Sequence, residues 1–243
     1  KKKKMEKALM SGADAVIVDL EDSVLPERKP WARKDVARFL AAAERHVIIM
    51  VRVNPLGSPD IAADLEAILP AKPDALVLPK SESGSSVAEL AAMLGLSHIP
   101  ILPIATETAK AVFRLGTYGA IASRLCGLTW GAEDLPAAIG ATAARKPNGR
   151  YTPPYELVRS LTLFGAHAAG VPAIETVYPD IADTVGLRAY AARGRRDGFS
   201  GMMAVHPTQV PFINAAFSPN DAEIAHARAV IAAFAANPGA GAP

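Results

Sequence analysis

The chain has a single cysteine, Cys126, among its 243 residues. One cysteine cannot form an internal disulfide, and such sparse use of cysteine is typical of proteins kept in a reducing compartment. The sequence also shows no N-terminal secretion signal, so we predict a cytoplasmic protein. Because Cys126 lies inside an apolar run, we interpret it as a core residue rather than as a nucleophile.

Long apolar runs and a strong charge bias are also missing. No apolar run approaches the roughly 18 residues of a membrane-spanning helix. The formal net charge is +2, and Lys1–Lys4 supply four of the 26 basic residues, which leaves 22 against 24 acidic residues. Nucleic-acid binding requires a basic face with stacking aromatic residues, and the sequence shows neither. The composition therefore predicts no membrane partner and no nucleic-acid partner.

Several common catalytic motifs are absent. The sequence has no glycine-rich phosphate loop, no G-x-S-x-G, no C-x-x-C and no H-E-x-x-H. These motifs position phosphates, a nucleophilic serine, a redox-active cysteine pair and a zinc ion, respectively. Their absence counts against an NTPase, a serine hydrolase, a thiol redox enzyme and a zinc protease.

Half of the residues are hydrophobic, and seven short runs of them have the pattern of strands buried on both faces. The predicted strands are Ala15–Asp19, Val47–Val53, Ala75–Pro79, Ile101–Ala105, Leu125–Trp130, Ala173–Val177 and Met202–Val205. Predicted helices include Met5–Met10, Asp60–Leu69, Tyr155–Ala169 and a last helix from Ser218 to about Ala236. We expect Ser58 to cap the second of these helices and Asp221 to complete a capping box in the last.

The alternation of strands and helices predicts a parallel sheet with right-handed crossovers. We expect residues 1–243 to form a single (β/α)₈ barrel, or TIM barrel, with irregular ends at Lys1–Lys4 and 237–243. Seven strands are one fewer than this barrel needs, and the chain opens on a helix, so we infer that a first strand precedes Lys1. The long loop Ala143–Pro154 is expected to lie over the mouth of the barrel.

Two acidic residues, Glu107 and Asp134, each follow a predicted strand, and one helix separates these strands. In parallel α/β proteins, functional side chains gather at the carboxyl ends of the strands. Two carboxylates that converge there repel each other unless a cation lies between them, and Mg²⁺ prefers such oxygen ligands. The pattern favours a magnesium site, although each acid could instead cap the helix after it. Glu175, within a strand, is interpreted as a hydrogen-bonded internal acid.

Other ionisable residues follow the first three predicted strands. Arg52 lies in an apolar strand, where its planar fork suits a substrate carboxylate. A structural salt bridge from Arg52 to Glu21 or Asp22 is the alternative. Lys80 could bind a phosphate or carboxylate, or it could pair with a neighbouring acid. The sequence therefore predicts one densely ionisable face.

Six short motifs occur in order along the chain. They are Gly12–Val24 with Glu21-Asp22, Val51–Pro55 with Arg52, Leu78-Pro79-Lys80, Glu107-Thr108-Ala109, Gly131-x-x-Asp134-Leu135 and His206-Pro207-x-Gln209-Val210. In these motifs, from about Met5 to Val230, the chain resembles the citrate lyase β-subunit family. These proteins are CoA-ester lyases related to the 4-hydroxy-2-oxo-acid aldolases.

The resemblance implies a TIM barrel assembled as a homotrimer or hexamer, with Mg²⁺ as cofactor. It also implies that a loop with two acidic residues lies near the metal and that an arginine contacts the substrate. The implied metal ligands are Glu107 and Asp134, the implied catalytic residues are Arg52, Glu21 and Asp22, and the implied substrate-binding residues are Arg52, Lys80, Gly131, Ala132 and Glu133.

The implied reaction is Mg²⁺-dependent cleavage of a 3-hydroxyacyl thioester of CoA or acyl carrier protein to an acetyl thioester and a 2-oxo acid, or the reverse. Arg52 would stabilise the developing negative charge, and Glu21 or Asp22 would accept the hydroxyl proton. Malyl, citramalyl and citryl groups, with glyoxylate, pyruvate or oxaloacetate as the 2-oxo acid, differ by groups that a pocket separates by only about 1–3 kcal/mol. The sequence does not choose among them.

The sequence is also compatible with three other roles. The chain could be an aldolase for free 4-hydroxy-2-oxo acids, a carrier-protein-dependent citrate lyase subunit, or a non-catalytic barrel. It departs from the family pattern in lacking the first strand with its Arg-Ser and in having Gly201-Met202 where many members have Gly-Lys. It also ends soon after its last helix, whereas members that hydrolyse the thioester often have a further segment. We therefore expect cleavage rather than thioester hydrolysis.

Overall fold

Strands and helices alternate along the chain in the computed structural model, which describes residues 2–44 and 46–236. The strands are β1 (Ala15–Asp19), β2 (Ile48–Arg52), β3 (Ala75–Leu78), β4 (Ile101–Pro103), β5 (Leu128–Thr129), β6 (Ala173–Glu175) and β7 (Gly201–Met202). The α-helices are α1 (Lys2–Leu9), α2 (Lys29–Ala42), α3 (Ile61–Ile68), α4 (Gly84–Met93), α5 (Ala109–Val112), α6 (Leu135–Ile139), α7 (Pro153–Ala168), α8 (Thr184–Asp197), α9 (Val210–Phe217) and α10 (Asp221–Ala236). Short 3-10 helices are η1 (Pro26–Arg28), η2 (Leu69–Ala71), η3 (Leu115–Arg124) and η4 (Pro207–Gln209).

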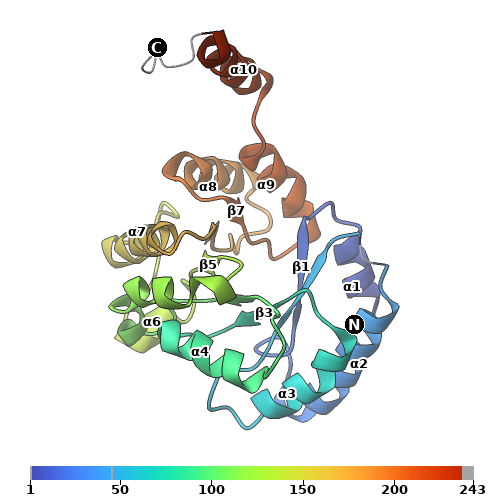
Figure 1. Ribbon diagram of the computed structural model, residues 1–243. Helices are drawn as coiled ribbons and strands as arrows, with labels where there is room; N and C mark the ends of the chain where they lie inside the picture. The colour runs from blue at the N-terminus through green and yellow to red at the C-terminus, as the bar shows by residue number, and fades with distance from the viewer. Residues whose placement is uncertain (1, 45, 237–243) are drawn as a thin grey trace.

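All strand pairs are parallel, and they follow the order of the sequence. β1 to β4 form one sheet and β5 to β7 a second. Single parallel bridges, Ile101 to Leu125 and Ile104 to Thr129, connect the two sheets along β4 and β5. The helices surround these strands in Figure 1, whereas α10 stands apart from the ring. The predicted parallel α/β architecture is confirmed.

The array of strands is open between β7 and β1. Within residues 2–44 and 46–236, no ladder joins these two strands. An apolar cavity of about 460 Å³ lies between them and is lined by inward-facing side chains such as Ile17, Met50 and Ile174. Closure of the barrel by a strand before Lys1 stays a prediction.

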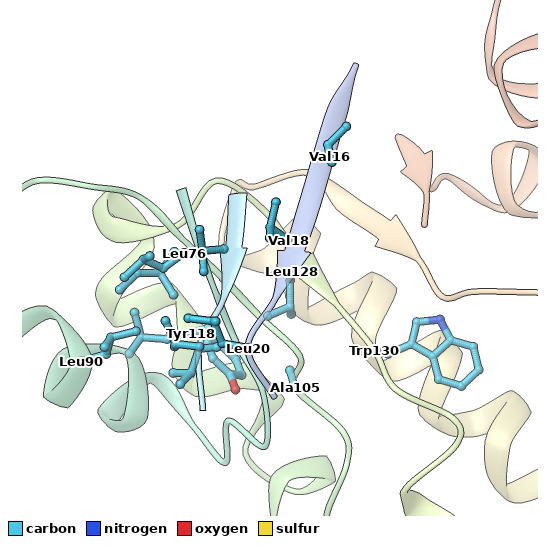
Figure 2. Packing of buried hydrophobic residues seen from close by; sticks show 14 of the residues in the cluster. Val16, Val18, Leu20, Leu76, Leu90, Ala105, Tyr118, Leu128 and Trp130 are labelled. Carbon is cyan, nitrogen blue, oxygen red and sulfur yellow. The ribbon is translucent and has the colours of Figure 1, made fainter. Parts of the chain in front are cut away.

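The strands are buried on both faces, as their continuous hydrophobicity predicts. Alternate residues of β3 show this clearly, because Leu76 and Leu78 belong to the main hydrophobic cluster beneath the helices. Val77, between them, packs with Leu102 and Ile104 in a smaller cluster on the other face. Figure 2 shows part of the main cluster. Cys126 packs against the smaller cluster, which confirms its interpretation as a core residue.

Some predicted boundaries are wrong. The strand predicted over Leu125–Trp130 is limited to Leu128–Thr129, and the last strand is Gly201–Met202 instead of Met202–Val205. Lys2–Lys4 belong to helix α1 and are not irregular, in keeping with the good helix propensity of lysine. The predicted irregular ends at Lys1 and at 237–243 lie outside the described residues.

Two capping predictions also need correction. The capping box of α10 is formed by Asn220 and Glu223, since the Asn220 side chain accepts from the Glu223 amide at 2.9 Å and the Glu223 carboxylate accepts from the Asn220 amide at 2.8 Å. Asp221 is the first helical residue instead. Ser58 accepts from the amide of Asp60, ahead of a helix that begins only at Ile61. Among the helices of the described residues, none has the length and apolar character to cross a membrane.

Candidate active site

Polar side chains gather where the first three strands end. Asp19 is the last residue of β1, Arg52 is the last residue of β2, and the two lie opposite each other in the ladder. Lys80 follows two residues after β3. Because parallel strands end at a common edge, residues from three parts of the sequence meet here. The predicted ionisable face therefore exists at the carboxyl edge of the sheet.

Arg52 is held by acids from the neighbouring strand and loop. Its Nε and Nη2 atoms donate to the two carboxylate oxygens of Asp19, each at 2.7 Å. Its Nη1 lies 3.0 Å from Glu21 and 3.7 Å from Asp22. The salt bridges anticipated as the alternative are thus present, and the main partner, Asp19, was missed. The cross-strand register places Asp19 opposite Arg52, and this register is not specified by the sequence alone.

Lys80 connects the acids of two strand ends. Its backbone lies in the left-handed region at φ +51°, a conformation that is uncommon and costly for a non-glycine residue. This turn points its amide at Glu107, which accepts a hydrogen bond from it. The Nζ atom lies 2.6 Å from Glu21 and 3.5 Å from Asp134. Pairing with neighbouring acids, one of the two interpretations of Lys80, is therefore observed.

Glu21 and Asp22 differ sharply although they are adjacent in the sequence. Glu21 is buried, while Asp22 is exposed. Burial raises the pKa of Glu21, even though Lys80 and Arg52 favour its charged form. The Asp22 carboxylate lies 4.0 Å from Lys80 Nζ, a longer distance than the 2.6 Å between Lys80 Nζ and Glu21. Of the two predicted proton acceptors, Glu21 is the one enclosed in the cluster.

Glu107 and Asp134 come together as predicted from their positions after two strands. Their side chains are in direct contact, and Glu107 is only 6 % exposed. Burial, together with the contact and charge of Asp134, raises the pKa of Glu107 to about 8. Neither acid caps a helix with its side chain, because Thr108 caps α5 and Asp134 makes no capping hydrogen bond to α6. The capping alternative is therefore wrong for both residues.

The donor set at this edge fits a divalent cation. Glu107 and Asp134 bring two carboxyl groups together at the carboxyl edge of the strands. Within the described residues, no group of three or more His, Cys, Asp or Glu side chains is arranged to hold a metal ion. Two carboxylates with the remaining positions open to water and substrate are typical of Mg²⁺, whereas structural zinc needs four protein ligands.

Gly131, Ala132 and Glu133 connect the carboxylate pair to an open cleft. The Gly131 amide donates to Thr106 Oγ1 at 3.1 Å, and the Thr106 hydroxyl donates back to the Gly131 carbonyl at 3.2 Å. Ala132 is buried, whereas Glu133 lines a cleft of about 1110 Å³. The loop predicted to lie over the barrel mouth, Ala143–Pro154, forms one wall of this cleft.

Gly131 leaves no space for a side chain against Glu107. A Cβ atom at Gly131 would lie 2.8 Å from Glu107 Cγ. We expect Gly131→Ala to displace Glu107 and to weaken Mg²⁺ binding about 10- to 100-fold, the usual effect of disturbing the support of a metal ligand. Titration calorimetry with Mg²⁺ measures this change. Gly116→Ala is the matched control, since its Cβ would meet no atom within 4 Å, and equal affinities for the two variants would contradict the expectation.

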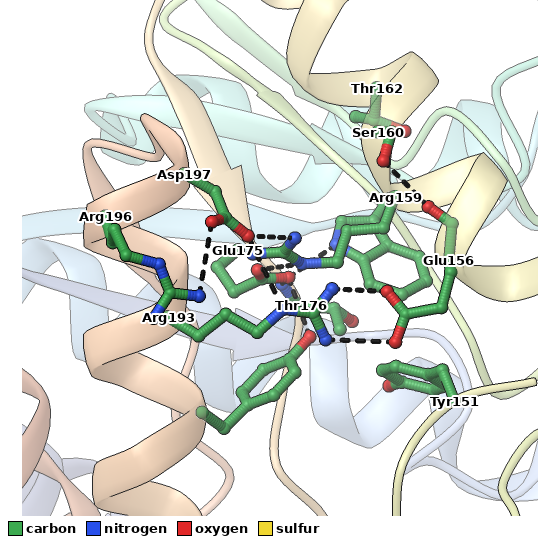
Figure 3. A network of polar contacts seen from close by, with 12 residues as sticks. Tyr151, Glu156, Arg159, Ser160, Thr162, Glu175, Thr176, Arg193, Arg196 and Asp197 are labelled. Carbon is green, nitrogen blue, oxygen red and sulfur yellow. Dashed lines mark hydrogen bonds and ion pairs between the residues drawn. The ribbon is translucent and has the colours of Figure 1, made fainter.

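Glu175 is the last residue of β6 and is fully buried. Trp130 Nε1 donates to it at 2.6 Å and Tyr190 at 2.8 Å, and Arg159 Nε donates to its second oxygen at 2.6 Å. Figure 3 shows this network continuing to Asp197 and Glu156. The interpretation of Glu175 as a satisfied internal acid is confirmed, although Arg159, its charged partner on α7, was not anticipated.

Comparison with known proteins places the site in a family. A family model described as HpcH/HpaI aldolase/citrate lyase matches residues 1–207. The chain belongs to this family. A citrate lyase subunit beta-like protein of Mycobacterium tuberculosis is 36% identical over 230 residues, with 95% of this chain and 80% of that protein covered. A (3S)-malyl-CoA thioesterase of Cereibacter sphaeroides is 36% identical over 240 residues, with 96% and 79% covered.

Solved structures of family members have the same fold. CitE from M. tuberculosis in complex with magnesium, acetoacetate and coenzyme A is 34% identical, with a TM-score of 0.84 over 99% of this chain and 86% of that chain. The M. tuberculosis citrate lyase beta subunit with oxaloacetate and magnesium is also 34% identical, with a TM-score of 0.80 over 89% and 92%. The family resemblance of the motifs is therefore confirmed, and the parallel α/β fold is shared with these proteins.

Proposed function

We propose that this family member is a Mg²⁺-dependent carbon–carbon lyase that cleaves a 3-hydroxyacyl thioester to an acetyl thioester and a 2-oxo acid, or catalyses the reverse reaction. The observation that supports this most directly is the contact between Glu107 and Asp134 at the carboxyl edge of the strands. Homologous structures with magnesium, oxaloacetate and coenzyme A support the same chemistry. We further propose that the protein acts as a homo-oligomer, a trimer or hexamer.

In this proposal, Glu107 and Asp134 would hold Mg²⁺. The bound ion would supply Lewis-acid polarisation of the substrate hydroxyl and its adjacent carboxylate. Such polarisation favours loss of the hydroxyl proton, which begins the cleavage.

The remaining steps belong to side chains of this chain. Glu21 would accept the hydroxyl proton, because it is buried in the cluster and its pKa is raised by that burial. The hydroxyl oxygen then becomes the carbonyl of the 2-oxo acid as the carbon–carbon bond breaks, and the electron pair of that bond passes to the thioester as an enolate. Arg52 directs Nε and Nη2 toward Asp19 and Nη1 toward Glu21 and Asp22, and the second hydrogen of Nη2 would stabilise the enolate charge. Return of the proton from Glu21 to the enolate carbon would give the acetyl thioester.

Substrate orientation is assigned to the loop after β5. The backbone of Gly131 to Glu133 lies between the carboxylate pair and the open cleft, where it could orient a substrate carboxylate. Lys80 lies 3.5 Å from Asp134 and supplies the nearest positive charge to that acid. Together they would fix the hydroxy acid group over Glu107 and Asp134.

Thioester hydrolysis is a second candidate, because one relative with 36% identity is named a (3S)-malyl-CoA thioesterase. Hydrolysis and cleavage give different products from the same substrate. Hydrolysis releases free CoA thiol and the intact hydroxy acid, whereas cleavage releases acetyl-CoA and a 2-oxo acid. Product identity therefore separates the two activities in one assay.

The test is incubation of the purified protein with Mg²⁺ and with malyl-, citramalyl- and citryl-CoA in turn. We expect release of a 2-oxo acid from at least one thioester, and we expect EDTA to remove that activity and added Mg²⁺ to restore it. Coupled reduction of the 2-oxo acid, with thiol titration in parallel, measures both products. Thiol release without a 2-oxo acid would show hydrolysis instead.

The negative outcomes are also informative. Activity that is insensitive to EDTA would contradict the metal assignment. Inactivity with all three CoA esters, combined with activity on a free 4-hydroxy-2-oxo acid, would favour an aldolase. Activity only on a carrier-protein thioester would favour the role of a citrate lyase subunit.

A further inference from the structure

Lys80 shares a left-handed backbone with Lys72, and φ is +51° at both residues. Glycine adopts this conformation at the lowest cost, so a residue with a side chain there calls for an explanation. Lys72 is exposed and follows the short helix η2. Lys80 is half-buried, and its turn directs the backbone amide at Glu107. A glycine would direct that amide equally well, so the turn does not explain why position 80 carries an ammonium group.

The Lys80 ammonium lies among acids that belong to two parts of the site. Its Nζ atom is 2.6 Å from Glu21 Oε1 and 3.5 Å from Asp134 Oδ2, and Asp22 Oδ1 is 4.0 Å away. Glu21 is the proposed proton acceptor, and Asp134 is a proposed metal ligand. One side chain therefore connects the carboxylate that would take up the proton with the pair that would hold Mg²⁺.

Arg52, the other cation at this edge, is not shared between the two parts. It makes two hydrogen bonds to Asp19, and its remaining ion pairs are with Glu21 and Asp22. Within residues 2–44 and 46–236, Lys80 is the only basic side chain that forms an ion pair with Asp134. The positive charge that the carboxylate pair meets from the protein itself therefore comes from Lys80.

A cation between Glu107 and Asp134 would compete with this ammonium. Lys80 and a divalent ion are both attracted to the Asp134 carboxylate, and at this short range they repel each other. The Lys80 side chain is 37% exposed, and lysine has a long flexible stem. Its Nζ atom can therefore leave Asp134 and keep the shorter contact with Glu21, without any change in the backbone turn.

We propose that Lys80 is an internal counter-cation that pairs with Asp134 until Mg²⁺ binds and then pairs with Glu21 alone. This inference rests on the proposed function for the identity of the metal and of the proton acceptor. In the metal-free protein, the ammonium offsets part of the repulsion between the acids. In the metal-bound protein, it holds the Glu21 carboxylate in place for proton transfer. Lys80 is thus a positioning residue that acts through Glu21.

The exchange predicts that metal affinity and turnover change in opposite directions when the ammonium is removed. Lys80→Met keeps the length of the side chain, but Mg²⁺ no longer has to displace a cation. We expect this variant to bind Mg²⁺ about 2- to 10-fold more tightly than the native protein, as for the loss of a competing, partly exposed ion pair. Titration calorimetry of the metal-free proteins with Mg²⁺ measures this affinity without turnover.

Two further variants separate the charge from the shape of the side chain. Lys80→Arg keeps the positive charge and should bind Mg²⁺ within about two-fold of the native affinity. Lys80→Gly removes the charge and relaxes the turn, so it should bind Mg²⁺ more tightly than the native protein. It keeps the test decisive if circular dichroism and thermal unfolding show that Lys80→Met is not folded.

Lys72→Met is the matched control. Lys72 has the same φ angle as Lys80 but precedes β3, whereas Lys80 follows it, so the two lysines lie at opposite ends of one strand. The control should keep the native Mg²⁺ affinity. High salt should narrow the difference between the native protein and Lys80→Met, because it screens the ammonium.

The outcomes separate this inference from the proposed function. Equal or weaker Mg²⁺ binding in Lys80→Met and Lys80→Gly would overturn the inference, even if the native protein is an active lyase. Tighter binding in both, without lyase activity in the native protein, would support the exchange of partners and reject the proposed reaction. A native protein that does not bind Mg²⁺ would refute the metal site and the inference together.

If the lyase reaction is observed, turnover tests the second half of the inference. Lys80→Met should lower kcat about 10-fold or more at saturating Mg²⁺, because Glu21 loses the group that positions it. Lys80→Arg should restore most of this loss. A residue that merely supports the fold of the site would weaken Mg²⁺ binding and turnover together. Unchanged kcat in Lys80→Met would overturn the assignment of Lys80 to the positioning of Glu21.

Discussion

Glu107→Gln is expected to lower metal-dependent cleavage by about 10³-fold or more, a loss of roughly 4 kcal/mol of transition-state stabilisation. The amide keeps the size of Glu107 and can still accept the hydrogen bond from the Lys80 backbone. It cannot supply a second negative charge beside Asp134, so the Mg²⁺ site would be lost. Asp134→Asn should have a similar effect on activity.

The thermal stability of Glu107→Gln without Mg²⁺ should not fall, although its activity does. Glu107 is buried against another carboxyl group, and this environment raises its pKa to about 8. At neutral pH the native protein must take up a proton at Glu107 on folding, because this pKa lies well above that of a free carboxyl group. Glutamine needs no proton, so Glu107→Gln should unfold at the same temperature as the native protein or higher without Mg²⁺. Of these two proteins, only the native one should gain thermal stability when Mg²⁺ is added, because only the native protein retains the Mg²⁺ site.

Glu82→Gln serves as the control for this pair of measurements. Glu82 follows the same strand as Lys80, but it pairs with Lys110 and is not part of the carboxylate pair. Its activity should stay within about two-fold of the native value, as expected for a partly exposed ion pair. Native-like turnover in Glu107→Gln, or equal losses in Glu107→Gln and Glu82→Gln, would refute the assignment of the metal site.

The carboxylate pair could be predicted because its position depends on topology rather than on detailed geometry. Short apolar runs followed by Glu107 and Asp134 suffice to place both acids at one edge of a parallel sheet. The same reasoning places Arg52 and Lys80 there. It requires no knowledge of side-chain conformation, and it uses the most reliable sequence signal, hydrophobic periodicity.

Partner choice within that edge could not be predicted in the same way. The sequence suggests Glu21 and Asp22 as partners of Arg52. In the structure, Arg52 makes its bidentate contact with Asp19, because the β1–β2 ladder places Asp19 opposite Arg52. A shift of one residue in strand register would have pointed Asp19 to the other face. Register depends on packing between strands, which a single sequence does not specify.

The predicted boundaries of strands and helices are wrong where several local sequence signals compete. The strands β5 and β7 are each two residues long, although the hydrophobic runs that contain them are longer. At α10, Ser218 and Asn220 are both good capping residues, and Asn220 forms the box because Glu223 is three residues beyond it. The rings of Tyr151, Tyr178 and Tyr190 surround the Arg145 guanidinium. Because these tyrosines come from separate parts of the chain, no sequence motif indicates this arrangement.

Arg159→Met is expected to cost about 3–5 kcal/mol of folding free energy, the usual result of removing one partner from a buried ion pair. Arg159 is 2 % exposed and Glu175 is fully buried, with 2.6 Å between the Arg159 Nε atom and the Glu175 carboxylate. Methionine fills similar space but leaves Glu175 without a charged partner. Urea unfolding monitored by circular dichroism measures the loss. Arg196→Gln is the control, since Arg196 is 71% exposed where it meets Asp197, and it should lose no more than about 1 kcal/mol.

The double variant Arg159→Met with Glu175→Gln shows whether an unpaired charge causes the loss. Glutamine removes the charge, yet its amide oxygen can still accept from Trp130 and Tyr190, which now donate to Glu175. The double variant should therefore be more stable than Arg159→Met alone. If it is equally unstable or less stable, the loss arises from packing around Arg159, such as its contact with the Phe199 ring, and not from the buried carboxylate. Because Trp130 also packs on Tyr151 of the cleft, a loosened network should disturb the wall of that cleft as well, which would connect the stability of this internal acid to the shape of the candidate site.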